Sequence, residues 1–204
     1  MIIVARSEDK LNQLKAELEK EYKVEVKVIA KDLTKFESTQ EIYDEVKAEG
    51  IQVEYLLNNA GFGGHGYFHE RTMEEDMAMI NLNIIALTSL TKLFLPDFTK
   101  RNSGKILNVS STASFMPGPL QAVYFATKAF VTFLSNAISE ELSNTNITVT
   151  NLMPGATETE FAKAGSAHVT EDGEGIAIAY TMGSMKIAGN RNEVSDNDGT
   201  AGSN

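Results

Sequence analysis

The feature of this sequence that most constrains its fold is a regular alternation between short apolar runs and longer amphipathic stretches. Short apolar runs predict buried strands, and apolar residues that recur with a helical period predict helices. Strands are predicted over 1–5, 24–30, 53–57, 105–110 and 147–153, and helices over 7–22, 38–48, 72–95 and 124–142. Right-handed crossovers join strands that alternate with helices. The sequence therefore predicts an α/β fold with one doubly wound parallel sheet, whose ligands lie at the carboxyl ends of the strands.

Two of the predicted helices begin with a capping-box signature, in which Ser or Thr is followed three residues later by Glu. The pairs are Ser38 with Glu41 and Thr72 with Glu75. Pro96 lies in the apolar helix that Thr72 opens. Because proline has no backbone N–H, we expect Pro96 to bend or end that helix.

Length and composition predict a single folded domain. The chain has 204 residues, of which 42% are hydrophobic, and it contains no internal repeat. This is enough for one α/β domain with a buried core. The alternating pattern fades after Gly165, and residues 190–204 are rich in Asn, Asp, Gly and Ser. We expect one domain over 1–189 and a frayed tail over 190–204.

The charge of the chain excludes several partners. Its net charge is -10, and no basic patch stands out, so binding to nucleic acid or to an anionic membrane is not expected. The opening apolar run over 1–4 is too short for a signal peptide, and no stretch looks long enough to span a bilayer. The chain has no cysteine, which excludes disulfides and thiol chemistry. These features predict a cytoplasmic protein.

The strongest candidate for chemistry is the pair Tyr124 and Lys128 in the last predicted helix. A spacing of four places the phenol and the ammonium on one face of that helix. A free tyrosine titrates near pH ~10, so it needs nearby positive charge to act as an acid or base closer to neutral pH. The same spacing also arises by chance, so the pair alone does not define a site.

Ser111 strengthens this interpretation because it ends a predicted strand, thirteen residues before Tyr124. That position is where a doubly wound sheet holds its ligands, and the hydroxyl can bind a substrate oxygen there. A serine at such a place can also be an ordinary turn or capping residue. Its neighbour Ser110 differs from it only in the offset from Tyr124.

Further motifs accompany these residues in a fixed order along the chain. They are Asn58-Asn59-Ala60-Gly61 at a strand end, Asn83-Ile84-Ile85-Ala86 in the next helix, Ser111, the Tyr124/Lys128 pair, and Pro154-Gly155 after the last strand. Over about residues 1–163 this series resembles the short-chain dehydrogenase/reductase family. The resemblance implies a Rossmann-type fold and an oxidoreductase that uses NAD(P)(H).

The resemblance also implies roles for four residues. Tyr124 would be the catalytic acid/base, and Ser111 would polarise the substrate carbonyl or alcohol. Lys128 would lower the pKa of the tyrosine and hold the nicotinamide ribose. Asn83 would anchor a water that relays the proton to Lys128. The apolar neighbours of Asn83 in the sequence argue against a solvated helix face for this residue, and a buried amide needs hydrogen-bond partners.

The resemblance implies cofactor contacts as well. The candidate cofactor-binding residues are Arg6, Asp32, Asn58, Ala60, Gly61, Tyr124, Lys128, Pro154, Gly155 and Thr159. Asp32 resembles an aspartate that contacts adenine, and Thr159 resembles a threonine that binds the nicotinamide amide. Ala5 stands where NAD-preferring members carry an acidic residue, and Arg6 can pair with a 2′-phosphate, so NADP is expected rather than NAD. A solvated surface Arg and a helix cap are the alternatives for Arg6 and Thr159.

The glycine-rich run over 61–66 fits the G-x-G-x-x-G pattern, but no helix opens at its last glycine. We therefore expect a flexible loop near the substrate and no phosphate-binding turn. His65 and His69 lie in or beside this loop, with no matched carboxylate geometry. No metal site is expected from them.

The glycine-rich phosphate turn of the family, which joins its first strand and helix, has no counterpart before residue 50. The chain begins at what resembles the second strand of the order 3-2-1-4-5-6-7. A missing first strand would leave a gap of ~10 Å between the strands at 1–5 and 53–57, with unpaired backbone on both sides. Weak cofactor binding is the consequence. The last strand of the family is expected near residues 187–196.

These observations favour an NADP(H)-dependent carbonyl reductase or alcohol dehydrogenase that acts on a small-molecule carbonyl or alcohol substrate. The resemblance also implies a homodimer or homotetramer, formed through the helices at 72–95 and 124–142. Two other hypotheses stay open: a catalytically silent fragment or scaffold that cannot hold the cofactor pyrophosphate, and a nucleotide-binding regulator without turnover.

Overall fold

The computed structural model describes residues 1–155 and 177–180. Strands and helices alternate along the first of these ranges as the sequence predicts. The elements are β1 (Ile2–Ala5), α1 (Glu8–Tyr22), β2 (Lys27–Ala30), α2 (Phe36–Ala48), β3 (Tyr55–Asn58), α3 (Met73–Ile80), the π-helix η1 (Asn81–Ala86), α4 (Leu87–Arg101), β4 (Gly104–Val109), the 3₁₀-helix η2 (Thr112–Phe115), α5 (Ala122–Glu141), β5 (Ile147–Leu152) and β6 (Ala177–Tyr180). The predicted tail at 190–204 and the last strand expected at 187–196 lie outside the described residues.

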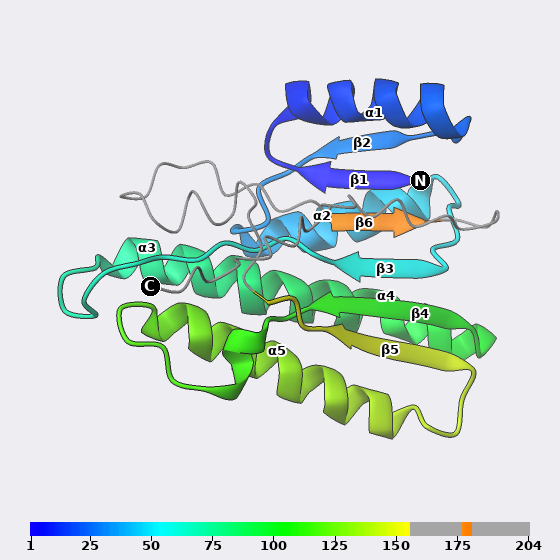
Figure 1. Ribbon diagram of the computed structural model, residues 1–204. Helices are drawn as coiled ribbons and strands as arrows, with labels where there is room; N and C mark the ends of the chain where they lie inside the picture. The colour runs from blue at the N-terminus through cyan, green and yellow to red at the C-terminus, as the bar shows by residue number, and fades with distance from the viewer. Residues whose placement is uncertain (156–176, 181–204) are drawn as a thin grey trace, which may run out of the picture.

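The strands form one sheet in the order β2-β1-β6-β3-β4-β5. The pairs β1–β2, β3–β4 and β4–β5 are parallel. Their carboxyl ends therefore meet along one edge of the sheet, on the left in Figure 1. The predicted α/β fold with a Rossmann-type sheet is confirmed.

The strand β6 differs from the sequence-based expectation. It lies between β1 and β3, where a gap was predicted, and it is antiparallel to both neighbours (Figure 1). The prediction of an open gap is therefore wrong, and an antiparallel strand stands at this position of an otherwise parallel sheet. Facing strand edges with unpaired N–H and C=O groups are unfavourable, and β6 satisfies groups on both sides. A run of four residues in a region without clear periodicity gave no signal of this pairing.

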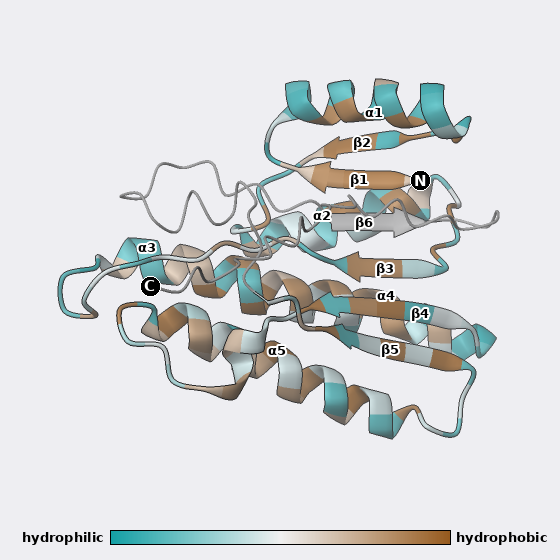
Figure 2. Ribbon diagram, in the orientation of Figure 1, coloured by the Kyte–Doolittle hydropathy of each residue, from teal (hydrophilic) through white to brown (hydrophobic). Residues whose placement is uncertain are grey.

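Helices cover the two faces of the sheet unequally. Among the described residues, α1 packs on β1 and β2 at one face, while α2, α4 and α5 form a continuous layer on the other. The main core lies under that layer, and Figure 2 shows β1, one of the strands that contribute to it, as hydrophobic along its length. A smaller cluster centred on Ile3, Leu11 and Val26 lies under α1.

One predicted helix start is confirmed and another is wrong, and Pro96 does not end its helix. Thr72 caps α3 through the predicted capping box with Glu75. Ser38, in contrast, is buried inside α2, which begins at Phe36 because a tight turn after β2 already starts the helix. Pro96 does not end its helix either, since α4 continues to Arg101. Tertiary packing of the residues around Pro96 outweighs its missing hydrogen bond.

The continuous helical segment from Met73 to Arg101 is long and apolar enough to cross a membrane, contrary to the expectation that no such stretch exists. Its inner face packs on the sheet, with Phe94 and Phe98 in the main core. A core helix of this kind meets the same length and composition test. The segment therefore provides no argument for membrane insertion.

Phe98 offers a direct test of this packing. Its side chain is fully buried, and a Cβ on Gly104 would lie 2.3 Å from its ring. We expect Phe98→Ala to lower the free energy of unfolding by about 3–5 kcal/mol in urea denaturation, because it removes a large core side chain. The matched control is Phe36→Ala on the exposed side of α2, for which we expect a change within about 0.5 kcal/mol. Equal effects of the two substitutions would contradict the assigned core.

Candidate active site

The candidate site lies where β3, β4 and β5 end and α5 begins. Ser110 and Ser111 follow β4, and Pro154 follows β5. The two segments are joined by backbone hydrogen bonds, from Ser110 N to Leu152 O at 2.8 Å and from Thr112 N to Pro154 O at 3.0 Å. Parallel strand ends thus gather the predicted residues at one edge of the sheet.

Tyr124, Lys128 and Ser111 converge at this edge. The Ser111 hydroxyl lies close enough to the Tyr124 phenol to lower its pKa. The Lys128 ammonium lies 5.8 Å from the centre of the Tyr124 ring. The phenol, the hydroxyl and the ammonium that the sequence singled out therefore share one small region of the molecule.

Ser111 and Ser110 have different surroundings, which separates two residues that sequence alone could not. The Ser110 hydroxyl donates to Lys128 O at 2.7 Å and contacts the Thr132 hydroxyl at 2.7 Å, so it ties α5 to the sheet. Ser111 caps η2 and accepts from Ala113 N at 3.1 Å. Ser111 thus combines the capping role considered as an alternative with a position beside Tyr124.

Lys128 is the most buried charge of the site. Its side chain lies against Val109, whose carbonyl accepts from the ammonium at 2.9 Å. Burial lowers the pKa of Lys128 from its ordinary 10.5 to about 8. A buried ammonium with a lowered pKa is typical of functional sites.

The pKa of Tyr124 does not follow the expected direction in the chain on its own. Burial raises this pKa above its ordinary value of 10, and the nearby Ser111 hydroxyl counteracts only part of that increase. Desolvation disfavours the phenolate more than its surroundings favour it. Further positive charge beside the phenol is therefore needed before Tyr124 can lose its proton near neutral pH.

Asn83 lies in the π-helix η1, a rare widening of the helix that often occurs at functional sites. Its amide oxygen accepts from Phe62 N at 3.1 Å, and its amide nitrogen donates to Phe62 O at 2.9 Å and to Thr127 Oγ1 at 3.1 Å. Asn83 therefore fastens the loop after β3 to the helix that carries Tyr124. Sequence analysis missed Thr127, although it lies between the two residues of the Tyr124/Lys128 pair.

Gly61 is placed where only glycine fits. A Cβ at this position would lie 2.9 Å from Asn83 Oδ1 and 3.5 Å from Lys128 Nζ. The backbone after β3 thus approaches two of the candidate catalytic side chains directly. Ala60 precedes it and is partly buried.

The side chain of Asn58, in contrast, lies inside the core, where it donates to Asn108 Oδ1 at 2.8 Å and to Thr91 Oγ1 at 3.1 Å.

The residues predicted to bind the adenosine end lie at the same sheet edge but apart from Tyr124. Arg6 is exposed directly after β1. Asp32 follows β2 and accepts from Thr34 N at 3.0 Å and from the Thr34 hydroxyl at 2.8 Å.

Of the candidate cofactor-binding residues after β5, Gly155 is exposed and has open space around it. Thr159 lies outside the described residues.

The described residues fit a nicotinamide cofactor only in part. Gly61, Asn83 and the Lys128 ammonium form a close-set group suited to the nicotinamide ribose. The helix after β1 is less suitable for a pyrophosphate, because its first turn carries Glu8 and Asp9, and carboxylates there repel an anion.

The two histidines of the glycine-rich loop are not part of a cluster. His69 lies 3.9 Å from Glu70, and both side chains are exposed. Within residues 1–155, His, Asp and Glu side chains form no group of three that could hold a metal ion.

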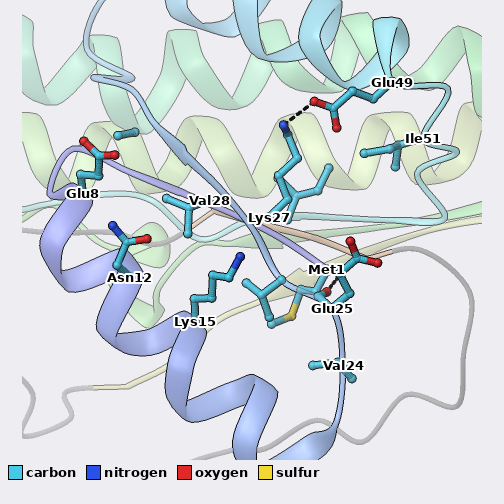
Figure 3. Close-up of a pocket in the computed structure, with 13 residues that line it drawn as sticks. Met1, Glu8, Asn12, Lys15, Val24, Glu25, Lys27, Val28, Glu49 and Ile51 are labelled. Atoms are coloured by element: carbon cyan, nitrogen blue, oxygen red, sulfur yellow. Dashed lines mark hydrogen bonds and ion pairs between the residues drawn. The ribbon is translucent and has the colours of Figure 1, made fainter.

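A separate pocket of about 860 Å³ lies between α1 and the β2 edge of the sheet (Figure 3). Glu8, Asn12 and Lys15 of α1 line one side. On the other side, Lys27 is held by Glu49 at 2.6 Å. The pocket lies away from Tyr124 and contains acidic side chains, so it does not extend the candidate active site.

Comparison with known proteins identifies the family. The short chain dehydrogenase family matches residues 1–170. Very-long-chain 3-oxoacyl-CoA reductase of Macaca fascicularis is 36% identical over 169 residues, covering 80% of this chain and 53% of that protein. The human protein of the same name is 34% identical with the same coverage. A short-chain dehydrogenase from Sphingobium yanoikuyae, solved in complex with NADPH, has a TM-score of 0.74 at 32% identity, covering 82% of this chain and 68% of that chain.

The chain therefore belongs to the short-chain dehydrogenase family, whose members are oxidoreductases. The predicted family is confirmed. The chain spans about half the length of the curated relatives it matches.

Replacing Lys128 by Met should stabilise the fold at neutral pH. Because the pKa of Lys128 is about 8 in the folded chain and 10.5 when exposed, the unfolded state binds the proton more tightly. The cost of burying the charge is complete below pH 8 and disappears as the pH rises from 8 to 10.5. We expect Lys128→Met to raise the free energy of unfolding by about 1–3 kcal/mol at pH 7 and to lose this advantage near pH 10.5.

Urea unfolding between pH 7 and 10.5 measures this difference. The control is Lys92→Met on the exposed side of α4, which should show no pH-dependent change relative to the wild type. A Lys128→Met variant that is less stable than the wild type throughout this range would show that the buried ammonium carries no such cost.

Proposed function

We propose that the protein is an NADP(H)-dependent oxidoreductase that transfers a hydride between nicotinamide and a carbonyl or alcohol carbon, with Tyr124 as the acid/base. The observation that carries this proposal is the convergence of the Tyr124 phenol, the Ser111 hydroxyl and the buried Lys128 ammonium at one edge of the sheet. A nicotinamide supplies or accepts the hydride when it is bound.

In the direction of reduction, the substrate oxygen accepts hydrogen bonds from the Ser111 and Tyr124 hydroxyl groups, which polarise the carbonyl. The Tyr124 hydroxyl then gives its proton to that oxygen as negative charge develops on it. Lys128 stabilises the resulting phenolate by its positive charge. Asn83 acts by holding the loop after β3 against α5, through its bonds to Phe62 and Thr127.

The raised pKa of Tyr124 suits this direction. A phenol that keeps its proton at neutral pH is ready to act as an acid toward a carbonyl oxygen. In the reverse direction, the positive charge of an oxidised nicotinamide favours the phenolate.

A carbonyl substrate with an apolar chain fits the surface around the site. Two aromatic side chains of the loop after β3, Tyr67 and Phe68, and two side chains after β4, Phe115 and Met116, are each more than half exposed. The mammalian relatives are named very-long-chain 3-oxoacyl-CoA reductases, which makes 3-oxoacyl thioesters the first substrates to test.

NADP rather than NAD is the proposed cofactor, because Arg6 is exposed at the end of β1, where it can reach a 2′-phosphate. The NADPH-bound relative supports nicotinamide binding by the family but does not decide between the two cofactors.

A cytoplasmic location is proposed from the acidic charge and the absence of cysteine.

A silent scaffold is the second candidate function. The observation in its favour is the acidic first turn of α1, formed by Glu8 and Asp9, next to the strand slot that β6 fills. A protein in which no other segment binds the pyrophosphate would hold the cofactor weakly. Quenching of NADPH fluorescence by the purified protein distinguishes the two candidates, since the scaffold predicts no saturable binding.

Tyr124→Phe tests the proposed acid/base. We expect this variant of the full-length protein to reduce carbonyl substrates about 10²–10⁴-fold more slowly, because the proton donor is lost. Its NADPH dissociation constant should change by less than about twofold. The measurement is NADPH oxidation at 340 nm with a panel of ketones, aldehydes and 3-oxoacyl thioesters.

The matched control is Tyr43→Phe, which removes a hydroxyl hydrogen-bonded to Asp97 at 3.2 Å on the α2–α4 side of the molecule. It should retain wild-type turnover. Normal turnover by Tyr124→Phe would rule out the proposed mechanism.

A homodimer or homotetramer is proposed to form through α5. Phe130 is 40% exposed and Phe133 is 73% exposed, and their spacing of three places them side by side on this helix. Adjacent large apolar side chains on a surface indicate contact with another subunit. We expect Phe133→Glu to shift the protein toward the monomer in sedimentation velocity, whereas Phe36→Glu on α2 should leave the association unchanged. A monomeric wild-type protein would contradict this proposal.

A further inference from the structure

The loop that follows β3 is organised around one buried arginine. The Arg71 side chain is 7% exposed, and its Nε lies 2.7 Å from Oδ1 of Asp76, which is 10% exposed. Asp76 belongs to the first turn of α3, which the Thr72–Glu75 capping box holds in place. Arg71 is thus anchored to the start of a helix that is itself firmly capped.

The guanidinium occupies the space that side chains would need in the glycine-rich run. A Cβ on Gly64 would lie 2.5–2.6 Å from Nη2, Cζ and Nη1 of Arg71. Gly66 has a φ of +149°, and its Cβ would lie 3.3 Å from Arg71 Cγ. The glycines therefore let the loop backbone lie directly on the arginine side chain.

The same loop is bonded to the segment that leads into α5. Gly66 N donates to Leu120 O at 2.8 Å, and Leu120 has a φ of +65° although it is not a glycine. α5 begins two residues after Leu120, and Tyr124 lies in its first turn. Arg71 and Tyr124 also line one small cavity of about 10 Å³, together with Gly64, Gly66 and Gln121.

One nitrogen of the guanidinium, Nη2, is buried and has no hydrogen-bond partner among the described residues. A buried charged group with an unmet donor is unfavourable, so a side chain that served packing alone would be better replaced by an apolar one. A buried guanidinium at this position is consistent with a role of Arg71 in holding the loop after β3 in one conformation.

From these contacts we propose that Arg71 is a positioning residue that sets the loop over 61–71 against the start of α5 and thereby fixes the substrate side of the Tyr124 site. This inference rests on the proposed oxidoreductase function. Arg71 acts through the loop and through Leu120, and it does not contact the reacting atoms. It should therefore control how well the carbonyl substrate is held, while the proton transfer by Tyr124 and the binding of NADPH proceed as before.

The test compares substrate kinetics of Arg71→Met and wild-type full-length protein. We expect the KM for a carbonyl substrate to rise about tenfold, with kcat and the NADPH dissociation constant within about twofold. Arg71→Lys should give an intermediate KM, because an ammonium can pair with Asp76 but does not reproduce the planar guanidinium. Arg71→Met combined with Asp76→Leu removes both charges and provides a second variant if the single one fails to fold.

The matched control is Arg101→Met. Arg101 is also largely buried, donates to Ser103 O at 2.8 Å and lies at the far end of α4. It should lower stability without changing the KM. An Arg71→Met variant with a wild-type KM, or one that behaves like Arg101→Met, would overturn the inference.

A second measurement tests the contact itself. Gly64→Ala should raise the KM as Arg71→Met does, since the new methyl group displaces the guanidinium. In an Arg71→Ala background, the same Gly64→Ala change should have no further effect on KM or on the thermal midpoint. Full additivity of the two changes would contradict the inference.

Failure of this inference and failure of the proposed function give different results. If Tyr124→Phe turns over normally, the proposed function fails, whatever Arg71 does. If Tyr124→Phe is inactive and the Arg71 variants keep a wild-type KM, only the positioning role fails.

Discussion

The burial of the Lys128 ammonium is the constraint on which the rest of the candidate site depends. A charge in this position is tolerated because the carbonyl of Val109 accepts from it and because Gly61 leaves room beside it. Desolvation lowers its pKa and raises that of Tyr124, so burial disfavours the charged form of both groups. The fold provides this arrangement by ending β3 and β4 next to the first turns of α5.

The fold could be predicted from the sequence wherever the pattern is local and periodic. The strands and helices up to β5 follow from apolar spacing, and Thr72 follows from its capping box. Ser38 was misread because the same signature occurred inside a helix whose start is set by the preceding turn. Pro96 does not end its helix, because burial of its neighbours in the core outweighs its local preference. β6 depends on long-range pairing, which no local pattern records.

The residues of the candidate site could be predicted from the sequence, but the contacts that hold them in place could be predicted only in part. Tyr124, Lys128 and Ser111 were accessible through spacing and strand ends, and the structure brings them together. The bonds that align them were not accessible, because Thr127 and Arg71 act through contacts between segments distant in sequence. The direction of the Tyr124 pKa was also missed, since burial of a side chain cannot be read from helical spacing alone.

The short strand β6 has a consequence for how the molecule can open. The hydrogen-bond ladder between the β2–β1 pair and the β3–β4–β5 group passes only through these four residues in the described part of the chain. The apolar core is not divided at β6, because side chains from β1, β2, α2 and α4 belong to one continuous cluster. Release of β6 therefore breaks the ladder but leaves the two halves docked through their helices. Release of β6 thus requires only local opening of the sheet, which costs less free energy than unfolding of the whole molecule.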